Sequence, residues 1–388
     1  MAQEAAAPPS KRARTATATT APSEAKQDAD YFTSYSDLRV HEDMLRDFAR
    51  TDAYRKAIAA ADLEGKVVLD VGGGTGVLSI FAAREGKAKR VYCVEASAIG
   101  AVAEQAVRAN NVGGTVVVLR GRMEDVVLPE TVDVIVSEWM GFGLLYEAML
   151  DSVLLARDRW LKPDVGRLLP DTATMRVALL GNDVHYHGNV RFWDSVMRDA
   201  YGLDYGFVRS PQWRRDGDRD EVVLEHVPPE CVLSRPATVA TIDLATATVD
   251  SLKRIESTFE LQAIVAAPLH GVVVWFDVDF NSNRGGGGGS KTTLSTSPYA
   301  TETHWKQTCL YSHVGRPVDL AQDDRVTGTL ALVRPAAFKR HLEIVVKTQC
   351  GRDNNNADGA CPDCAREHTF ALSSDPSIYV RGSLEVGK

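Results

Sequence analysis

The spacing of hydrophobic and polar residues divides the chain into three regions. Residues 1–30 are rich in Ala, Pro, Ser and Thr and show no regular hydrophobic spacing, which is typical of a disordered tail. Residues 31–60 place apolar side chains at helical spacing, and strand-like runs then alternate with helices to about residue 170. From residue 171 to 388, short β-rich runs are separated by Gly, Pro, Asn and Asp.

Residues 31–170 are predicted to form N-terminal helices followed by an α/β domain of a nucleotide-binding type. The expected strands lie at 66–71, 90–95, 116–120 and 133–137, and the expected helices at 77–84, 98–110 and about 144–160. Strands that alternate with helices of this length indicate βαβ units around a parallel sheet.

The C-terminal region is predicted to be an antiparallel barrel or sandwich. Its expected strands lie at 174–179, 221–225, 239–244, 259–265, 272–280, 307–311, 326–333 and 342–347. Residues 184–206 are instead aromatic with a helical pattern, which predicts an excursion whose apolar face needs a partner. Residues 281–297, with five consecutive glycines, are expected to be a flexible loop, and residues 351–368 a second insert rich in Asn, Asp and Cys.

Composition narrows the class of protein. No apolar run approaches the roughly 18 residues of a membrane helix, and the N-terminus lacks the apolar stretch of a signal peptide. A net charge of −8 argues against nucleic-acid binding through overall charge. Six cysteines without a signal indicate reduced thiols in the cytoplasm or nucleus. The basic cluster Lys11-Arg12-Ala13-Arg14 is either a nuclear-import signal or part of a solvated tail.

A glycine loop stands where the first strand turns into the first helix. Gly72, Gly74 and Gly76 let the backbone approach a ligand, and Asp70 lies two residues before them. Glu95, at the end of the second strand, is placed to accept hydrogen bonds from ribose hydroxyls. The spacing differs from the G-x-G-x-x-G of dinucleotide sites, and an acidic neighbour suits a cofactor ammonium better than a pyrophosphate. S-adenosylmethionine is therefore favoured over NAD, with a turn that binds no ligand as the alternative.

Two glutamates follow the fourth strand. Glu138 and Glu147 lie nine residues apart on a glycine-containing segment at the carboxyl edge of the sheet, where ligands bind in α/β domains. If they converge, their mutual repulsion would be relieved by a planar guanidinium with its fork of N–H donors. The alternative is two unrelated surface glutamates, which the apolar residues around them make less favourable.

Two further motifs carry less information. His304 stands between Thr303 and Trp305, and a histidine beside tryptophan is more often structural than catalytic. Cys350, Cys361, Cys364 and His368 have a spacing that suggests zinc. The polar insert between them favours a reduced loop without metal, so no metal ligand is assigned.

Taken together, the motifs resemble the protein arginine N-methyltransferase family, particularly its type I members and among those the small nuclear one. The resemblance covers about residues 31–350 and rests on six segments in order: Tyr31-Phe32-x-x-Tyr35, His41-Glu42-x-Met44-Leu45, Asp47-x-x-Arg50-Thr51, residues 68–76, residues 138–147 and Thr303-His304-Trp305. It implies a Rossmann-like S-adenosylmethionine-dependent methyltransferase domain followed by an antiparallel β-barrel. It also implies that the helical segment 184–206 is a dimerisation arm, which docks on the methyltransferase domain of a second copy in a head-to-tail homodimer.

The resemblance also implies roles for individual residues. Arg50 is expected to bind the cofactor carboxylate, Glu95 the ribose and Glu124 the adenine amino group. Glu138 and Glu147 are expected to grip the substrate arginine. The remaining implied site residues are His41, Asp70 and Gly72 beside the methionine moiety, His304 beside the site with Asp47 as its candidate partner, and Tyr35 and Met140 around the guanidinium. Phe142 departs from the family pattern, which commonly has tyrosine there.

The implied activity is transfer of methyl groups from S-adenosyl-L-methionine to arginine guanidinium nitrogens, with S-adenosyl-L-homocysteine as product. Mono- and asymmetric dimethylarginine on histone tails and other Arg-rich segments are expected, in the nucleus and also the cytoplasm. Neither membrane association nor direct nucleic-acid binding is expected. Three rival classes are a small-molecule methyltransferase, a nicotinamide oxidoreductase and a non-enzymatic scaffold. The paired glutamates and the long barrel disfavour a small-molecule methyltransferase, and the glycine spacing disfavours an oxidoreductase. The retained catalytic groups disfavour a scaffold.

Overall fold

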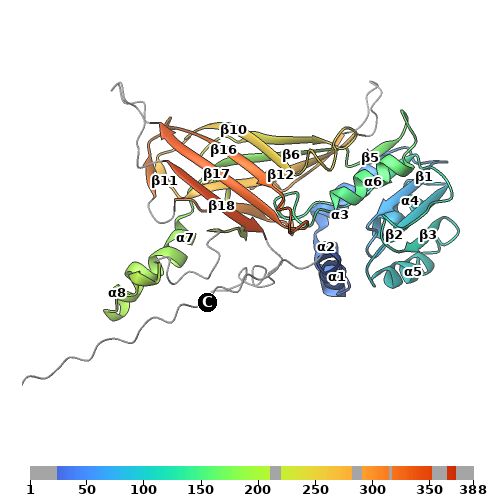
Figure 1. Ribbon diagram of the computed structural model, residues 1–388, viewed down its shortest axis with the longest axis horizontal. Coiled ribbons are helices and arrows are strands. Elements are labelled where there is room, and N and C mark those ends of the chain that lie inside the picture. Colours follow the sequence, from blue (N-terminus) through green and yellow to red (C-terminus); the bar gives the residue numbers. More distant parts are fainter. Residues whose placement is uncertain (1–23, 210–219, 282–290, 314–316, 352–364, 373–388) are drawn as a thin grey trace, which may run out of the picture.

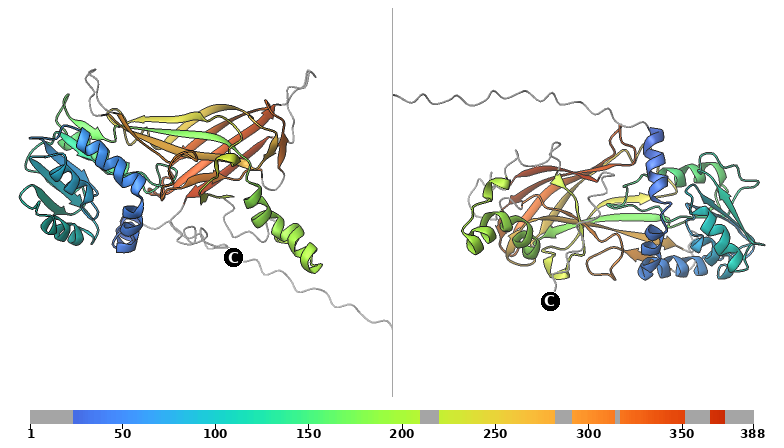
Figure 2. Two further views of the ribbon diagram at one scale, coloured as in Figure 1. Left: turned by 180° about the vertical axis from the view of Figure 1, so that it is seen from behind. Right: turned by 90° about the horizontal axis from the view of Figure 1, so that it is seen from below.

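The computed structural model describes residues 24–209, 220–281, 291–313, 317–351 and 365–372. An α/β domain lies at one end of the molecule, an elongated β region occupies the centre, and a helical arm projects from the far end (Figure 1). The N-terminal helices lie between the α/β domain and the β region, as the two further views also show (Figure 2).

Three helices precede the α/β domain: α1 (Glu24–Ser34), α2 (Leu38–Arg46) and α3 (Phe48–Ala60). Helix α1 corrects the predicted disordered tail, because residues 24–30 form its first two turns. Ion pairs with the β region hold this polar segment, from Glu24 to Lys339 and from Asp28 to Arg340, and hydrophobic periodicity does not reveal such contacts. Residues 1–23, which include the basic cluster, lie outside the described residues.

The α/β domain has a five-stranded parallel sheet with β1 (Val67–Val71) at its centre. The order is β3 (Val116–Arg120), β2 (Arg90–Glu95), β1, β4 (Val134–Val136) and β5 (Arg167–Leu169). Helices α4 (Val77–Arg84), α5 (Gly100–Ala109) and α6 (Leu150–Trp160) connect the strands. The direction of winding reverses between β1 and β4, so the loops after these two strands flank the crevice where ligands bind in such folds.

Helix α6 is shorter than predicted. The sequence indicated a helix from about residue 144, but α6 begins at Leu150. Leu144, Glu147 and Ala148 have φ angles of 71°, 74° and 59°, which an α-helix of L-residues cannot contain. Residues 137–149 therefore form a loop at the carboxyl edge of the sheet, called here the glutamate loop.

Two antiparallel layers form the β region. The first is β10 (Arg254–Gln262), β16 (Arg325–Val333), β17 (Leu342–Gly351), β18 (Arg366–Leu372) and β7 (Asp220–Glu221), the last strand joining in parallel. The second is β8 (Val223–Glu225), β14 (Gln307–Leu310), β12 (Gly271–Asn281), β6 (Thr172–Leu180) and β9 (Ala237–Asp243), with β13 (Lys291–Ser295) paired to β12. A small sheet pairs β11 (Ala267–Leu269) with β15 (Val318–Leu320).

The β region is antiparallel, as predicted, but the barrel is not closed, because no hydrogen-bonded ladder joins the two layers within the described residues. The chain instead passes between the layers at β7–β8 and at β9–β10. The strand predicted at 221–225 is accordingly split, with buried Val222 between its halves. Apolar side chains of both layers and of the parallel sheet share one large core, and a smaller cluster that includes Val273 and Trp275 belongs to the second layer.

Both predicted inserts are shorter than expected. Strand β13 takes up residues 291–295 of the predicted flexible loop, while the five glycines lie outside the described residues. His368 belongs to β18, where it pairs with Val346, and buried Cys350 belongs to β17. Cys361 and Cys364, which the zinc alternative also requires, lie outside the described residues.

The arm leaves the β region after β6 and is helical, as predicted (Figure 1). Its elements are α7 (Asp183–His185), η1 (Tyr186–Val190), η2 (Phe192–Val196), α8 (Met197–Tyr201) and η3 (Gly206–Arg209). Aromatic side chains along it are open to solvent, including Tyr201 at 72% exposure. Among the described helices, none is both long and apolar enough to span a bilayer.

Candidate active site

The glycine loop folds back over the end of β2. The N–H groups of Gly72 and Gly73 both donate to the Val94 carbonyl at 2.9 Å. Gly72 has a φ of 71°, and a Cβ there would lie 2.1 Å from Cε of Met149. The positive φ favours glycine here, and a Cβ would also displace the flexible end of the Met149 side chain.

Asp70 lies beneath this loop with an unused acceptor. It is fully buried, and its Oδ2 accepts a hydrogen bond of 2.7 Å from Ser79 Oγ. Its Oδ1 has no hydrogen-bond partner among the described residues. Burial raises the pKa of Asp70 to about 7. A buried oxygen without a partner marks a place where a ligand or water donates a hydrogen bond.

Glu95 and His41 border the same loop. The Glu95 carboxylate accepts from the Gly74 N–H at 2.9 Å and from the Ser97 N–H at 2.7 Å, which fixes both of its oxygens. The His41 ring lies 3.3 Å from where a Cβ of Gly74 would stand, and its Nε2 is 2.8 Å from the Tyr35 carbonyl oxygen. Helix α2 therefore closes one side of the crevice.

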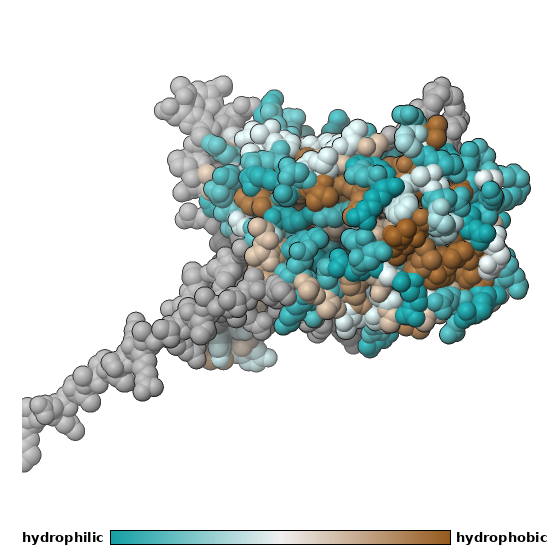
Figure 3. Space-filling model, turned by 45° about the vertical axis from the view of Figure 1, so that its right-hand side comes forward, coloured by the Kyte–Doolittle hydropathy of each residue, from teal (hydrophilic) through white to brown (hydrophobic). Residues whose placement is uncertain are grey.

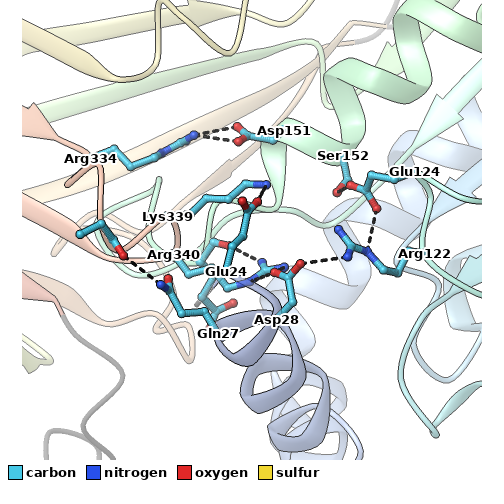
Figure 4. Close-up of polar contacts among 12 residues, drawn as sticks. Glu24, Gln27, Asp28, Arg122, Glu124, Asp151, Ser152, Arg334, Lys339 and Arg340 are labelled. Atoms are coloured by element: carbon cyan, nitrogen blue, oxygen red, sulfur yellow. Dashed lines mark hydrogen bonds and ion pairs between the residues drawn. The ribbon is translucent and has the colours of Figure 1, made fainter. Parts of the chain in front are cut away.

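Glu124 lies farther along the sheet edge, beyond β3. Ser152 Oγ donates to it at 2.7 Å and Arg122 Nε at 3.4 Å (Figure 4). Burial opposes ionisation, but these hydrogen bonds outweigh it and lower the pKa of Glu124. Glu124 is thus a carboxylate acceptor at the far end of the cofactor side.

Glu138 is held by Arg50. The guanidinium donates from Nε at 3.0 Å and from Nη2 at 2.9 Å to the same oxygen, Glu138 Oε2, and both side chains are more than nine-tenths buried. Arg50 also donates to the Met44 carbonyl at 3.1 Å. Arg50, expected at the cofactor carboxylate, therefore joins the cofactor side of the crevice to the first glutamate.

Glu147 is held by groups from distant parts of the chain. Tyr35 Oη donates to its Oε2 at 2.7 Å. Its N–H donates to the Arg340 carbonyl at 2.8 Å, and Arg340 Nη1 donates to its carbonyl at 2.7 Å. A positive φ costs a non-glycine residue about 1–3 kcal/mol, so these contacts must fix the strained backbone.

The charge of Glu138 contributes to the electrostatics of Glu147. Burial raises the pKa of Glu147 to about 7, and the charge of Glu138 acts in the same direction, while Tyr35 and Arg340 oppose it. The pair predicted from the nine-residue spacing is thus brought into one electrostatic environment. Its repulsion is offset by Arg50 on one member and by Tyr35 and Arg340 on the other.

His304 and Asp47 contact each other directly. The N–H of His304 lies 2.9 Å and its Nδ1 2.8 Å from Asp47 Oδ2. Asp47 Oδ1 accepts the Arg50 N–H at 2.8 Å and so caps helix α3. Although burial opposes it, the hydrogen bonds from His304 and Arg50 lower the pKa of Asp47. One carboxylate thus aligns the histidine and the helix that carries Arg50.

Met140 and Phe142 belong to the apolar part of the glutamate loop. Trp305 Nε1 donates to the Met140 carbonyl at 2.9 Å, and Tyr54 Oη lies 3.7 Å from the Met140 sulfur. Phe142 is half-buried and packs against the core. A Cβ on Gly141 would lie 2.1 Å from the Tyr146 carbonyl oxygen, so the turn closes on bare backbone.

Sequence reasoning missed the residues that hold these groups from a distance. Arg340 contacts Glu147 across 193 positions and Asp28 across 312, and Tyr54 Oη donates to the Ser137 carbonyl at 2.9 Å across 83. None of them lies in a motif. Only the fold brings them to the site.

Comparison with known proteins agrees with this arrangement. A family model described as "Methyltransferase domain" matches residues 68–164, and one described as "Arginine methyltransferase oligomerization subdomain" matches residues 171–352. Protein arginine N-methyltransferase 6 of Xenopus tropicalis is 41% identical over 328 residues, which cover 84% of this chain and 93% of that protein. The probable protein arginine N-methyltransferase 6 of Arabidopsis thaliana is 39% identical over 348 residues, covering 82% and 78%.

Solved structures share the fold. Protein arginine methyltransferase 10 of Arabidopsis thaliana superposes with a TM-score of 0.75 at 32% identity, covering 88% of this chain and all of that one. A Trypanosoma brucei PRMT1 enzyme–prozyme heterotetrameric complex with AdoHcy gives 0.75 at 31% identity, with the same coverage. Both the predicted fold class and the predicted cofactor are confirmed. The chain belongs to the protein arginine N-methyltransferase family and is an S-adenosylmethionine-dependent enzyme that methylates arginine in proteins.

Proposed function

We propose that this enzyme makes mono- and asymmetric dimethylarginine on histone tails and other Arg-rich segments. The observation that carries the proposal is that Glu138 and Glu147, on one loop at the carboxyl edge of the sheet, are each held by different groups, while the charge of Glu138 acts on Glu147. Two such carboxylates on rigid supports would suit a planar cation with several N–H donors.

The described residues fit S-adenosylmethionine on the cofactor side. Asp70 has a free buried acceptor for a cationic donor, and the close packing at Gly72 leaves bare backbone beside it. Arg50 and His41 would hold the amino-acid end, Glu95 the ribose and Glu124 the adenine amino group. When bound, the cofactor supplies an electrophilic methyl group on a sulfonium.

The glutamate pair would orient and polarise the substrate rather than deprotonate it beforehand. Arginine stays protonated throughout the accessible pH range, because its pKa lies far above that of any side-chain base in the site. Glu138 and Glu147 would accept N–H bonds so that positive charge collects away from one terminal nitrogen. That nitrogen then faces the methyl donor with its electron density available. The proton would leave late, to Glu147 or through His304 to Asp47, whose hydrogen bond of 2.8 Å fixes the imidazole.

Substrate class and product follow from charge and from the type I pattern. The net charge of −8 favours encounter with cationic, flexible tails at distances up to a Debye length of about 10 Å. Tyr35 and Met140 match type I members, and Tyr35 is tied to Glu147 through its hydroxyl. We infer that the pocket around them favours a second methyl on the same nitrogen.

The arm suggests a head-to-tail homodimer. Aromatic residues on it, including Trp193 and Tyr201, are open to solvent, as are Leu38, Val40 and Phe48 at α2–α3. Figure 3, which brings the α/β end forward, shows apolar side chains gathered within a hydrophilic surface. We propose that the arm of one copy covers this face of another. Sedimentation of Trp193→Asp should give monomers, and an unchanged mass would exclude this interface.

Nuclear residence is proposed from the cluster Lys11-Arg12-Ala13-Arg14. A fluorescent fusion of the full chain should concentrate in nuclei and lose that preference when the three basic residues become alanine. Equal distribution of both fusions would remove the proposal.

Mass spectrometry tests substrate and product together. A histone-tail peptide incubated with the enzyme and S-adenosylmethionine should gain 14 Da on arginine after one methyl transfer and 28 Da in total after two. Fragment ions distinguish asymmetric from symmetric dimethylarginine by their neutral losses. Methylation confined to lysine, or a symmetric product, would overturn the corresponding part of the proposal.

A further inference from the structure

Arg340 lies between helix α1 and the glutamate loop (Figure 4). It comes from the turn that precedes β17, and its side chain is only 15% exposed. Its Nη1 and its carbonyl bind the two backbone polar groups of Glu147. Its Nε and Nη2 donate to Asp28 Oδ1 at 3.0 and 2.6 Å, and its guanidinium lies 3.8 Å from the centre of the Tyr31 ring.

Asp28 extends this contact to the cofactor side. Its second oxygen, Oδ2, lies 3.0 Å from Arg122 Nη1, and the Asp28 side chain is 7% exposed. Arg122 in turn contacts Glu124, which Ser152 also binds. One buried carboxylate on α1 therefore joins the backbone of Glu147 to the residue expected at the adenine amino group.

Because the backbone of Glu147 is strained, its conformation depends on the contacts that hold it. Its φ of 74° is unfavourable without fixed partners, and both of its backbone groups bind Arg340. Its carboxylate binds Tyr35, which follows directly on α1. The position of α1 thus bears on both the backbone and the side chain of Glu147.

We propose that Arg340 is a positioning residue that, through Asp28, couples the position of helix α1 to the conformation of Glu147. This inference rests on the proposed role of Glu147 as a clamp for the substrate arginine. When Asp28 binds both arginines, α1 lies against the crevice, Tyr35 reaches Glu147, and Arg122 faces Glu124. A ligand that stabilises one end of this arrangement must stabilise the other by the same factor.

Calorimetry of an arginine peptide measures this coupling. With S-adenosyl-L-homocysteine bound to the wild-type enzyme, the peptide should bind about 5–50-fold more tightly than without it. In Asp28→Asn the factor should fall to nearly one, because the neutral amide cannot pair with two guanidinium groups. Asp28→Glu, which keeps the charge, should restore part of the factor. An unchanged factor in Asp28→Asn overturns the inference.

The structure offers a matched control in the same part of the molecule. Arg334 Nη1 binds both oxygens of Asp151 at 2.9 and 2.8 Å, and both side chains are largely buried. This ion pair also joins the β region to the α/β domain, but it contacts neither α1 nor Glu147. Asp151→Asn should lower the melting temperature and leave the coupling factor unchanged. Loss of coupling in Asp151→Asn would show a general packing effect and overturn the inference.

A pH profile separates positioning from a merely structural role. The groups that face Glu147 are Tyr35, Tyr31, Glu138 and Arg340. Burial raises the pKa of Glu147, and the charge of Arg340 partly offsets this. Arg340→Gln should move the acid limb of kcat/KM to higher pH, and a structural defect would lower kcat/KM equally at every pH.

Arg340→Lys and Glu147→Gln complete the series. Lysine keeps the charge but lacks the fork, so the acid limb should stay in place while the coupling falls. If Arg340→Gln does not fold, the acid limb and the coupling factor of Arg340→Lys test the inference in its place. Turnover retained in Glu147→Gln would refute the proposed function itself. An inactive Glu147→Gln enzyme together with intact coupling in Asp28→Asn would refute only the role of Arg340.

Discussion

The two sides of the crevice are built differently. On the cofactor side the contacts are local: Ser79 binds Asp70 across 9 positions, and Gly74 binds Glu95 across 21. On the substrate side, Glu147 is held from 112 and 193 positions away, and Glu138 from 88. The centre of the cofactor side, from Asp70 to Glu95, is thus formed by one run of strand, loop and helix, whereas the contacts of the glutamate pair come from distant parts of the fold.

This difference has an energetic consequence. The cofactor loop follows the central strand, and its main-chain hydrogen bonds fix it. The glutamate loop contains three non-glycine residues with positive φ, each costing about 1–3 kcal/mol, and tertiary contacts must offset that cost. A mutation on one side should therefore impair the function of that side and leave the other side largely intact. The exception is the coupling proposed through Asp28.

Glu147→Gln should produce the largest effect. It removes the charge that is proposed to attract and polarise the guanidinium, and it is expected to lower kcat by about 10³-fold or more. Binding of S-adenosylmethionine, measured by calorimetry, should stay within about threefold of the wild-type value, because the local contacts of the cofactor side remain. If turnover persists, the glutamate pair is not the substrate clamp. A parallel loss of cofactor affinity would contradict the separation of the two sides.

Glu95→Gln should give the converse pattern. It replaces a carboxylate expected at the ribose by a neutral amide, and a hydrogen bond to a charged group contributes about 1.5–3 kcal/mol. The Kd of the cofactor should therefore rise by about 10–100-fold, whereas kcat at saturating cofactor should change little. Titration calorimetry and initial rates distinguish the two quantities. A large fall in kcat with an unchanged Kd would contradict the assignment of Glu95 to cofactor binding.

The local side of the site could be predicted from the sequence. The alternation of strands and helices, the glycine loop and the strand-end Glu95 lie in one continuous stretch, and secondary structure alone brings them together. Strand β5 was missed, since three residues carry too little periodicity. Such an omission does not move the site, because the crevice is set by β1 and β4.

The supports of the substrate side could not be predicted in the same way. Arg340 and Asp28 are ordinary charged residues in sequence, and only the tertiary fold makes them neighbours of Glu147 and of each other. The same cause explains two errors. Polar contacts order residues 24–30, and external hydrogen bonds hold the loop at 144–149 out of the predicted helix.

The pH dependence of kcat/KM should report on Glu147. Because burial raises its pKa to about 7, the free enzyme loses this negative charge below that pH, and kcat/KM should fall about tenfold per pH unit. Stability should change in the opposite sense. A carboxyl group whose pKa is raised in the folded state favours folding at low pH, and that contribution is lost as pH rises through about 7. Asp70 acts in the same direction.

Thermal unfolding between pH 5.5 and 8 provides the control for this prediction. In Glu147→Gln the contribution of that residue to the fall in melting temperature should vanish, while the contribution of Asp70 remains. An acid limb of kcat/KM near pH 4.5 would show that Glu147 titrates as an exposed glutamate. The substrate side would then be open to solvent rather than held by the fold.

Tyr35→Phe should have the smallest effect and bears most directly on the remote supports. The change removes one hydroxyl and keeps the ring, so the hydrogen bond of 2.7 Å to Glu147 is lost while the packing with Tyr31 and His41 remains. That hydrogen bond lowers the pKa of Glu147 against its burial, so its loss should move the acid limb of kcat/KM to higher pH. At pH 7 the rate should fall about fivefold to tenfold, as expected for about 1 kcal/mol. At pH 9, where Glu147 is ionised in both enzymes, the difference should narrow.

An equal deficit at both pH values would mean that the hydroxyl only shapes the pocket. Arg340 would then be the main group that opposes the effect of burial on the pKa of Glu147.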